Sequence, residues 1–210
     1  MKAPQNHSFY SPLRYPGGKG ALSNFMKVVV AQNDLLDGEY TEVYAGGAGI
    51  AWSLLLQEYV RRVHINDLNM PLMAFWTSVV QLTDELCRLI EDTPVTIEEW
   101  HRQRLVQERA GEYSILELGF STFFLNRTNR SGILKGGVVG GKGQTGKWKL
   151  DARFNKKDLV KRIQRIGLYS SRINLYNLDA VHFIKEILPR LPQNNLVYLD
   201  PPYYKKGQDL

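Results

Sequence analysis

Hydrophobic and polar positions follow two periods along the chain. Segments with helical spacing separate short apolar runs that have the length of buried strands. The pattern predicts strands at residues 41–45, 62–65, 172–177 and 195–199, and helices at 20–33, 46–59, 72–92, from Thr96 onward, about 113–126, 156–166 and 179–188. Strands that alternate with helices predict an α/β fold built on a mostly parallel sheet.

The stretch between the second and third predicted strands is helical and basic, which predicts an insertion in an α/β domain. Residues 1–70 and 166–210 would form the cofactor-binding and catalytic domain, and residues 71–165 the insertion. Inside it, Thr96 and Glu99 have the spacing of a capping box. Seven glycines interleaved with lysines lie between Gly132 and Gly146. Such a loop is expected to be flexible alone and to order on a partner.

The composition is that of a globular chain. Its 210 residues, 43% of them hydrophobic, suffice for a full core in one domain, or in one domain with a large insertion. The single cysteine, Cys87, excludes an internal disulfide and predicts a buried thiol in a reducing compartment. The first residues lack the apolar core of a signal peptide, and no stretch has the length of a membrane span. These features predict a cytoplasmic protein.

The positive charge is concentrated in one segment. Residues 126–172 contain two acids, Asp151 and Asp158, against 13 Lys or Arg: Arg127, Arg130, Lys135, Lys142, Lys147, Lys149, Arg153, Lys156, Lys157, Lys161, Arg162, Arg165 and Arg172. The segment is therefore +11, and because the whole chain is +6, the remainder is −5. A solvated surface is one explanation. A polyanionic partner, above all nucleic acid, explains the concentration better.

The stretch "YAGGAGIAW" (44–52) has the composition of a nucleotide-binding turn at the start of a helix. Gly47 and Gly49 have the spacing of the dinucleotide fingerprint, but Trp52 occupies its third glycine position. Asp67 stands 18 residues past Gly49, at the end of the next predicted strand, where it could accept hydrogen bonds from ribose hydroxyls. This order fits either a dinucleotide or an adenosyl cofactor, and a tight structural turn explains the glycines about as well.

The stretch "RYPGGKG" (14–20) is not a phosphate-binding loop. The first glycine of that motif is Leu13 here, and Lys19 is followed by Gly20 instead of Ser or Thr. What remains is a turn that offers Tyr15 and Lys19, an aromatic ring and a cation.

The stretch "NLVYLDPPYY" (195–204) places a carboxylate at a strand end. Pro201 and Pro202 cannot donate ladder hydrogen bonds, so the strand ends there and Asp200 faces the ligand crevice of an α/β sheet. Asp200 and the carbonyl of Pro201 could accept both hydrogens of a nucleobase amine and draw its lone pair out of the ring plane. Tyr203 could stack on the base once it has left the duplex. A strand followed by a rigid turn is the simpler alternative.

Metal chemistry is not expected. His64 precedes the end of the second predicted strand and His182 lies in a helical pattern, with no cysteine or carboxylate cluster at ligand spacing. Both are interpreted as structural residues.

Together these motifs resemble those of DNA adenine N6-methyltransferases of the Dam type, the D12 class with a DPPY motif. They are "YPGGK" (15–19), "EVYAGGAG" (42–49), "NDLN" (66–69), "FFLNRTNRSGI" (123–133) and "DPPY" (200–203), in the family's order and over nearly the whole chain. The resemblance implies a Rossmann-like methyltransferase sheet with a helical target-recognition insertion. It also implies a bacterial or phage-type protein associated with the nucleoid.

The resemblance also assigns roles to residues. S-adenosylmethionine would be bound by Tyr15, Lys19, Asp67 and Asp200, with the turn at Gly46 and Gly47 beneath it. A flipped adenine would be held by the catalytic residues Asp200, Pro201, Pro202 and Tyr203. Double-stranded DNA would be contacted by Asn126, Arg127, Arg130, Ser131, Lys142 and Lys147.

Two departures from the family pattern stand out. Val43 and Tyr44 replace the Pro and Phe that the family often shows, a change that keeps an aromatic ring beside the cofactor. The sequence also ends seven residues after Tyr203, where family members continue with strands that complete the sheet. The strand at 196–199 is therefore expected to be an exposed edge. The sequence would be a fragment, or a partner would cover this edge, or the protein would be a degenerate copy.

Two functions of different classes follow. The first is an S-adenosylmethionine-dependent methyltransferase acting on adenine N6 in DNA, with cytosine-N4 and RNA methyltransferases as its nearest rivals. The second is a catalytically inert relic that binds DNA through residues 126–172, with salt-sensitive affinity.

Overall fold

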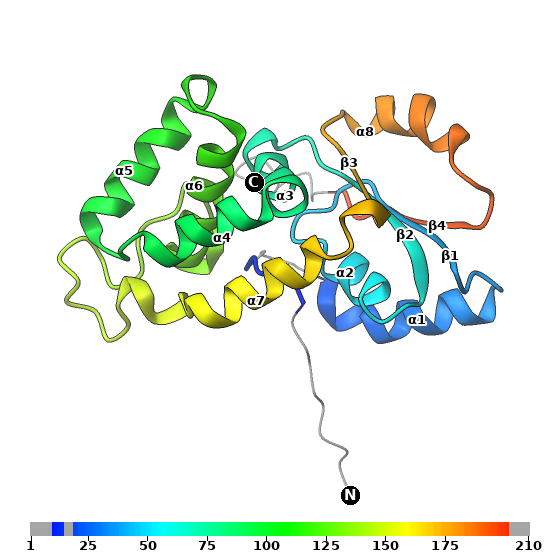
Figure 1. Ribbon diagram of the computed structural model, residues 1–210, viewed down its shortest axis with the longest axis horizontal. Helices are drawn as coiled ribbons and strands as arrows, with labels where there is room; N and C mark the ends of the chain where they lie inside the picture. The colour runs from blue at the N-terminus through cyan, green and yellow to red at the C-terminus, as the bar shows by residue number, and fades with distance from the viewer. Residues whose placement is uncertain (1–9, 15–18, 202–210) are drawn as a thin grey trace, which may run out of the picture.

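A computed structural model describes residues 10–14 and 19–201. The expected site residues Tyr15, Pro202 and Tyr203 lie outside these ranges. A four-stranded sheet contains β1 (Gly38–Glu42), β2 (Val60–Asn66), β3 (Ile173–Tyr176) and β4 (Asn195–Tyr198). The strand order is β3-β2-β1-β4, and every pair is parallel (Figure 1). The predicted α/β fold, Rossmann-like with a parallel sheet, is confirmed.

The strand order reverses direction at β1. The chain adds β2 and then β3 on one side of β1, and returns to the other side for β4. In open α/β sheets such a reversal leaves a crevice at the carboxyl ends of the two strands, and ligands bind there. Here Glu42 is paired with Tyr198, and the Val43 amide donates to the Tyr198 carbonyl at 3.3 Å. The residues that follow β1 and β4 therefore meet.

Helices cover both faces of the sheet and extend beside it. They are α1 (Ser23–Gln32, preceded by a 3-10 turn at Lys19–Leu22), α2 (Gly49–Leu55), α3 (Met70–Gln81), α4 (Thr83–Asp92), α5 (Ile97–Glu108), α6 (Ile115–Thr128), α7 (Lys156–Gly167) and α8 (Ala180–His182). A π turn (Phe183–Ile187) and a 3-10 turn (Leu188–Arg190) continue α8. In Figure 1, α1 and α2 lie on one side of the sheet, α8 lies on the other, and α3 to α6 form a separate group.

One hydrophobic core joins the sheet to the helical group. Tyr40 and Ile65, from β1 and β2, belong to the same buried cluster as the aromatic residues of α3 and α6. Phe75 stacks on Phe123 with ring centroids 5.8 Å apart. On the opposite face of the sheet a smaller cluster forms around Phe183. Because the main core is continuous, an insertion bounded at residues 71 and 165 stays a prediction.

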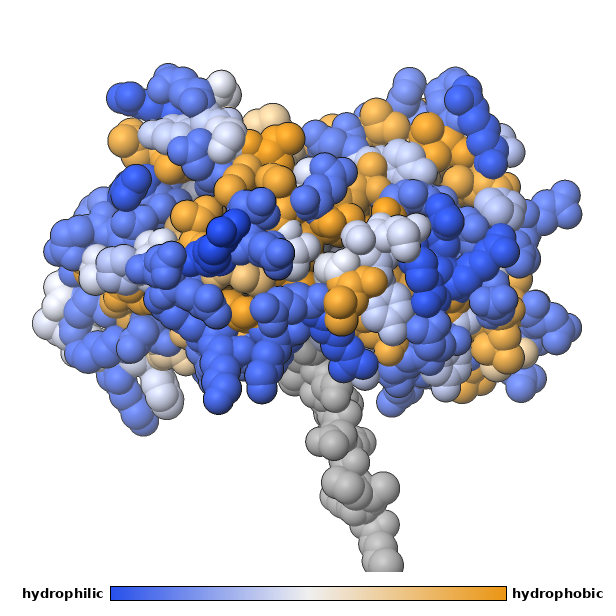
Figure 2. Space-filling model, viewed as in Figure 1, coloured by the Kyte–Doolittle hydropathy of each residue, from blue (hydrophilic) through white to orange (hydrophobic). Residues whose placement is uncertain are grey.

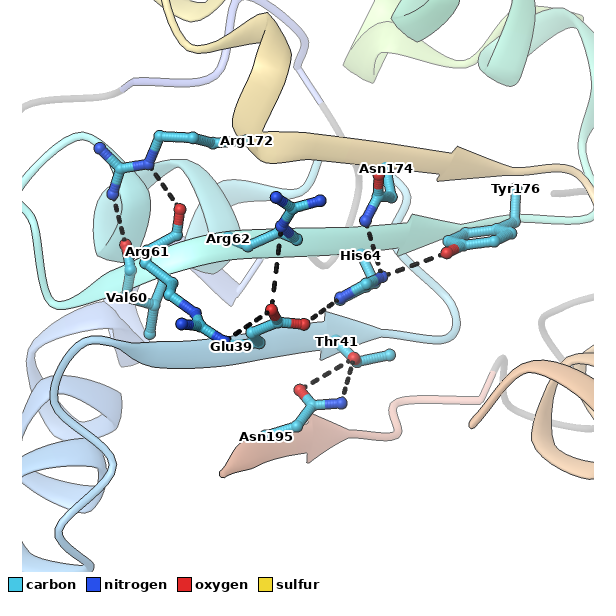
Figure 3. Close-up of polar contacts among 10 residues, drawn as sticks. All are labelled: Glu39, Thr41, Val60, Arg61, Arg62, His64, Arg172, Asn174, Tyr176 and Asn195. Carbon is cyan, nitrogen blue, oxygen red and sulfur yellow. Dashed lines mark hydrogen bonds and ion pairs between the residues drawn. The ribbon is translucent and has the colours of Figure 1, made fainter. Parts of the chain in front are cut away.

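The first strand begins three residues before its predicted start. The polar residues of this strand are not typical of a buried strand, so the sequence pattern did not indicate its start. In the structure their side chains form hydrogen bonds and ion pairs with neighbouring strands (Figure 3). The Glu39 carboxylate lies 2.7 Å from His64 Nε2, and the Thr41 hydroxyl lies 3.0 Å from both side-chain amide atoms of Asn195. The structural interpretation of His64 agrees with this network, which also includes the Tyr176 hydroxyl at 3.2 Å. Burial lowers the pKa of His64. Among the described residues, no group of three His, Cys, Asp or Glu could hold a metal ion.

Several predicted helices have different bounds. The segment 72–92 is two helices, because Leu82 leaves the helical region at φ −131° and ψ 39°. The expected capping box is half formed: Thr96 accepts a hydrogen bond from the Glu99 amide, but the Glu99 carboxylate accepts one from Gln103. The predicted helix 46–59 is shortened to α2, and the one at 179–188 is divided into α, π and 3-10 turns.

Side-chain hydrogen bonds hold the glycine-rich loop together, and its ordering on a partner stays a prediction. The Gln144 side chain braces it, donating to the carbonyls of Val139 at 2.8 Å and Gly141 at 2.6 Å. The same side chain accepts from the Leu150 amide at 2.8 Å. Val138 and Leu150 are buried in the main core and anchor both arms of the loop. The many glycines around Val138 and Leu150 indicated a loop without core contacts, so the burial of these two residues was not predicted.

Cys87 is buried, as expected, and burial raises the pKa of its thiol to about 11. Within the described part of the chain, no helix combines the length and apolarity needed to cross a membrane. Strand β4 forms one edge of the sheet, as expected, because within the described residues it pairs with β1 alone. A partner that covers this edge stays a prediction.

Asn66 is expected to be a main determinant of stability. Its buried side-chain amide donates to the carbonyls of Val43 and Leu178 and accepts from the Leu178 amide, each at 3.0 Å. Asn66→Ala would leave buried backbone groups unpaired, and we expect a loss of about 2–4 kcal/mol in the free energy of unfolding. Urea denaturation measures it. The control is Asn177→Ala, which removes two bonds from an exposed site, where water replaces them. Equal losses in the two variants would contradict the role of burial.

Candidate active site

The glycine turn after β1 is held on three sides. The Gly46 amide donates to Asp67 Oδ2 at 2.9 Å, and Trp76 Nε1 donates to the Gly46 carbonyl at 3.0 Å. The Ser11 hydroxyl donates to the Gly47 carbonyl at 2.6 Å. Gly46 has a φ of 50°, in the left-handed region that favours glycine. The turn is therefore a rigid platform of backbone without side chains.

Asp67 links this turn to the next helix. Its other oxygen, Oδ1, accepts from the Asn69 amide at 2.9 Å, and Asn69 caps α3. Burial raises the pKa of Asp67, while the backbone donors oppose that shift. Each carboxylate oxygen has a second lone pair, so Asp67 can still accept from a ligand hydroxyl. The predicted ribose-binding acid thus lies beside the predicted glycine turn.

Lys19 and Asp200 form an ion pair beyond the carboxyl end of β4. Lys19 Nζ lies 2.8 Å from Asp200 Oδ2, and each side chain is about one third exposed. Lys19 reaches this place because its 3-10 turn packs against the start of α2. A Cβ on Gly49 would lie 3.4 Å from the Gly20 Cα, so two glycines allow the backbones to approach. Two residues that are 181 positions apart in the sequence are thereby brought together.

Glu42 is a candidate site residue that the motif analysis missed. It ends β1 directly below the glycine turn, fully buried, where Oε1 accepts from the Tyr40 hydroxyl and the Ala51 amide, both at 3.1 Å. Burial, with a smaller contribution from the charge of Asp200, raises the pKa of Glu42 to about 8. An acid at the last position of a strand, before a glycine turn, was the signal that could have identified it.

Exposed apolar side chains follow three adjacent strands. Tyr44 follows β1, Leu68 follows β2 and Leu199 follows β4, and all three are exposed. Apolar side chains line most ligand sites, so these three are candidates to contact a ligand at the strand ends. Trp52, which replaces the third fingerprint glycine, has a different role: it is fully buried and packs on Trp76 at 4.9 Å.

Asn126 lies in the interior of the protein. Its side chain is buried, accepts from the Arg14 amide at 2.7 Å, and donates to the carbonyls of Arg14 and Gly132 at 2.8 and 2.9 Å. It fastens the segment before the lysine turn to the end of α6. A direct contact with DNA would need these bonds to break, so that part of the expectation stays an untested prediction.

The other predicted DNA-contacting residues differ in exposure. Arg127 is half-buried and donates to the carbonyls of Arg153 at 2.7 Å and Pro12 at 3.4 Å. Burial and then the charges of Arg14 and Arg162 lower its pKa to about 10, so it remains charged at neutral pH. The remaining residues, Arg130, Ser131, Lys142 and Lys147, are exposed.

The parallel sheet with its reversal at β1 has the topology of open α/β folds, in which ligands bind at the carboxyl ends of the strands. A family model described as D12 class N6 adenine-specific DNA methyltransferase matches residues 15–208. A comparison with curated proteins found no match. The chain therefore belongs to the D12 class of N6 adenine-specific DNA methyltransferases, and it is a DNA adenine methyltransferase by family.

Glu42 is expected to make stability depend on pH. The unfolded carboxyl loses its proton near pH 4.5 and the folded one near pH 8, so the folded state binds more protons in this window. Stability should therefore fall as pH rises from 4.5 to 8, by on the order of 3–5 kcal/mol from this group. Glu42→Gln removes that loss.

Denaturation at several pH values tests this. The difference in stability between Glu42→Gln and the wild type should increase steadily in favour of the variant from pH 4.5 to 8. Glu91→Gln, at an exposed position, should follow the wild-type profile. A constant difference across the window would show that Glu42 is charged in the fold.

Proposed function

We propose that this protein transfers a methyl group from S-adenosylmethionine to the N6 amine of an adenine flipped out of DNA. The observation that carries the proposal is the ion pair between Lys19 and Asp200, located at the switch point next to the glycine turn. Family membership supports the reaction class and the DNA substrate. Methyltransferases of this kind generally use S-adenosylmethionine, which supplies an electrophilic methyl group when bound.

The crevice has the groups that an adenosyl cofactor needs. Asp67 would accept hydrogen bonds from the ribose hydroxyls, and exposed Leu68 next to it would offer an apolar surface for a purine. The turn at Gly46 and Gly47 lets a ligand approach the backbone. Lys19 and the acidic Asp200 supply polar contacts, and Tyr15 is proposed as an aromatic wall.

Asp200 is proposed as the catalytic residue. The N6 amine of adenine is a poor nucleophile because its lone pair is delocalised into the ring. The Asp200 carboxylate and the Pro201 carbonyl would accept its two hydrogens, so that the lone pair leaves the ring plane. The lone pair would then bond to the methyl group that the bound cofactor supplies, with the thioether as leaving group, and the Asp200 carboxylate would accept the proton that the amine releases. Preorganised acceptors of this kind lower the barrier electrostatically.

Lys19 positions the acid. Its ammonium, 2.8 Å away, holds the Asp200 carboxylate at the crevice and compensates its charge before a substrate arrives. Pro202 and Tyr203 complete the proposed site, Pro202 by fixing the Pro201 carbonyl and Tyr203 by stacking on the adenine.

The helical group and the basic segment 126–172 are proposed to bind the DNA, with residues 71–165 as the target-recognition region. In α7, the apolar residues Leu159, Ile163 and Ile166 are buried, while Lys157, Lys161 and Arg165 are exposed. Figure 2 shows mostly hydrophilic residues along the lower margin of this part of the molecule. An enzyme that acts on DNA is proposed to work in the cytoplasm, at the nucleoid.

Asp200→Ala is expected to abolish methyl transfer. The variant loses one acceptor for the N6 amine, and removing one such group typically costs about 10²–10³ in rate. The measurement is incubation of unmethylated duplex DNA with labelled S-adenosylmethionine, followed by mass analysis of the nucleosides. Asp92→Ala, an exposed acid on α4, is the matched control and should keep full activity.

The outcomes separate the alternatives. N6-methyladenine from the wild type and none from Asp200→Ala would support the mechanism. Undiminished transfer by the variant would refute it. A wild type that binds DNA but neither transfers a methyl group nor binds the cofactor would favour the inert DNA-binding alternative.

Asp67→Ala is expected to weaken cofactor binding. Loss of hydrogen bonds from two ribose hydroxyls to a carboxylate should reduce affinity by about 10- to 100-fold. Calorimetric titration with S-adenosylhomocysteine, the demethylated product, measures this without turnover. A thermal unfolding curve of the same variant shows whether the glycine turn is still formed. Wild-type affinity in a folded Asp67→Ala protein would exclude Asp67 from the cofactor site.

A further inference from the structure

Trp148 stands out among the four tryptophans. Trp52 and Trp76 are fully buried and Trp100 nearly so, whereas Trp148 is 60% exposed. A tryptophan held in water forgoes the stabilisation that burial of its large apolar surface would give. An exposed tryptophan therefore suggests a ligand.

The loop that carries Trp148 is built to hold it in place. Gly140 has a φ of 81°, and a Cβ there would lie 2.5 Å from the Trp148 carbonyl, so only glycine permits this approach. Gln144 ties both arms of the loop together and bonds to the Leu150 amide, two residues after Trp148. The ring is thus presented by a braced loop, and ordering it on a ligand costs little conformational entropy.

Two cations lie over the ring. Lys147 Nζ is 5.8 Å and the Arg153 guanidinium carbon 5.9 Å from its centroid. Arg153 is in turn linked to the cluster around Arg127, which donates to its carbonyl. An exposed aromatic ring with two cations over it, in a segment of net charge +11, matches a ligand that combines a planar ring with a negative charge. A nucleotide has this combination.

We propose that Trp148 stacks on an unstacked base of the bound DNA while Lys147 and Arg153 contact the adjoining phosphates. The base would be one that opening of the duplex exposes. This inference rests on the DNA-binding function proposed above and adds to it a residue outside the motifs of the family. Stacking on an aromatic side chain does not depend on base identity, so Trp148 would contribute affinity without selecting the target sequence.

The experiment compares three probes of equal length: a single-stranded oligonucleotide, its duplex, and an abasic strand that has the phosphates but no bases. Acrylamide, a neutral quencher, reaches Trp148 and not the buried tryptophans. We expect the single strand to shield Trp148 from acrylamide and the abasic strand to leave it accessible. Trp148→Phe identifies the accessible emission and should retain most of the affinity, because a phenyl ring also stacks.

Affinities of the variants complete the test. Trp148→Ala should bind the single strand about tenfold more weakly than the wild type does. The slope of log K against log salt should be unchanged, because no phosphate contact is lost. The variant should bind the abasic strand as tightly as the wild type does. Lys147→Ala should reduce the magnitude of that slope by about 0.7 per phosphate contact, the value for a single strand. A Trp148 that stays accessible in the saturated complex, or a Trp148→Ala variant that binds the single strand as tightly as the wild type does, would overturn the proposal.

Two further outcomes distinguish failure of the stacking role from failure of the proposed function. Wild-type protein that methylates DNA while Trp148 remains accessible would refute the stacking role alone. Wild-type protein that binds none of the three probes would refute the stacking role together with DNA binding.

Discussion

The reversal of strand order at β1 is the constraint on which the site depends. Because β4 returns to the free side of β1, the parallel register that pairs Glu42 with Tyr198 brings the glycine turn and Asp200 to the same crevice. The hydrogen bond from Gly46 to Asp67 adds the end of β2, and the close approach of Gly20 to Gly49 adds Lys19. Four segments that are far apart in the sequence thus converge at the strand ends, which is how a rigid sheet preorganises a site.

Much of the fold could be predicted because its signals are local. Apolar runs gave β2, β3 and β4, and the alternation with helices gave the parallel sheet. The start of β1 was missed because a polar residue there is satisfied inside the structure. Glu39 resembles a loop residue until its partner His64 is known, and His64 lies on another strand. Leu82 fits the helical pattern of its segment, yet its backbone leaves the helix, so periodicity alone predicted one helix where there are two.

The sequence could predict which residues belong to the candidate site, but not which of them contact each other. Motifs located Lys19, Asp67 and Asp200, since each stands at a strand end or in a glycine turn. The contact between Lys19 and Asp200 depends on tertiary structure and has no local signal. The same limit applies to Asn126, whose place in a family motif suggested a surface contact although its amide joins buried backbone segments. Glu42 was missed because it lay near the start of the strand predicted at 41–45, whereas in the structure it is the last residue of β1.

Hydrogen exchange with and without S-adenosylhomocysteine tests the central claim most directly, since it locates a ligand on the chain without requiring turnover. The account predicts slower exchange in peptides covering residues 44–49, 66–70 and 199–201, which lie at the carboxyl ends of β1, β2 and β4. Protection should be absent from α5, far from the crevice. Unchanged exchange at all three strand ends in a saturated sample, or protection confined to the helical group, would contradict a cofactor site at the switch point.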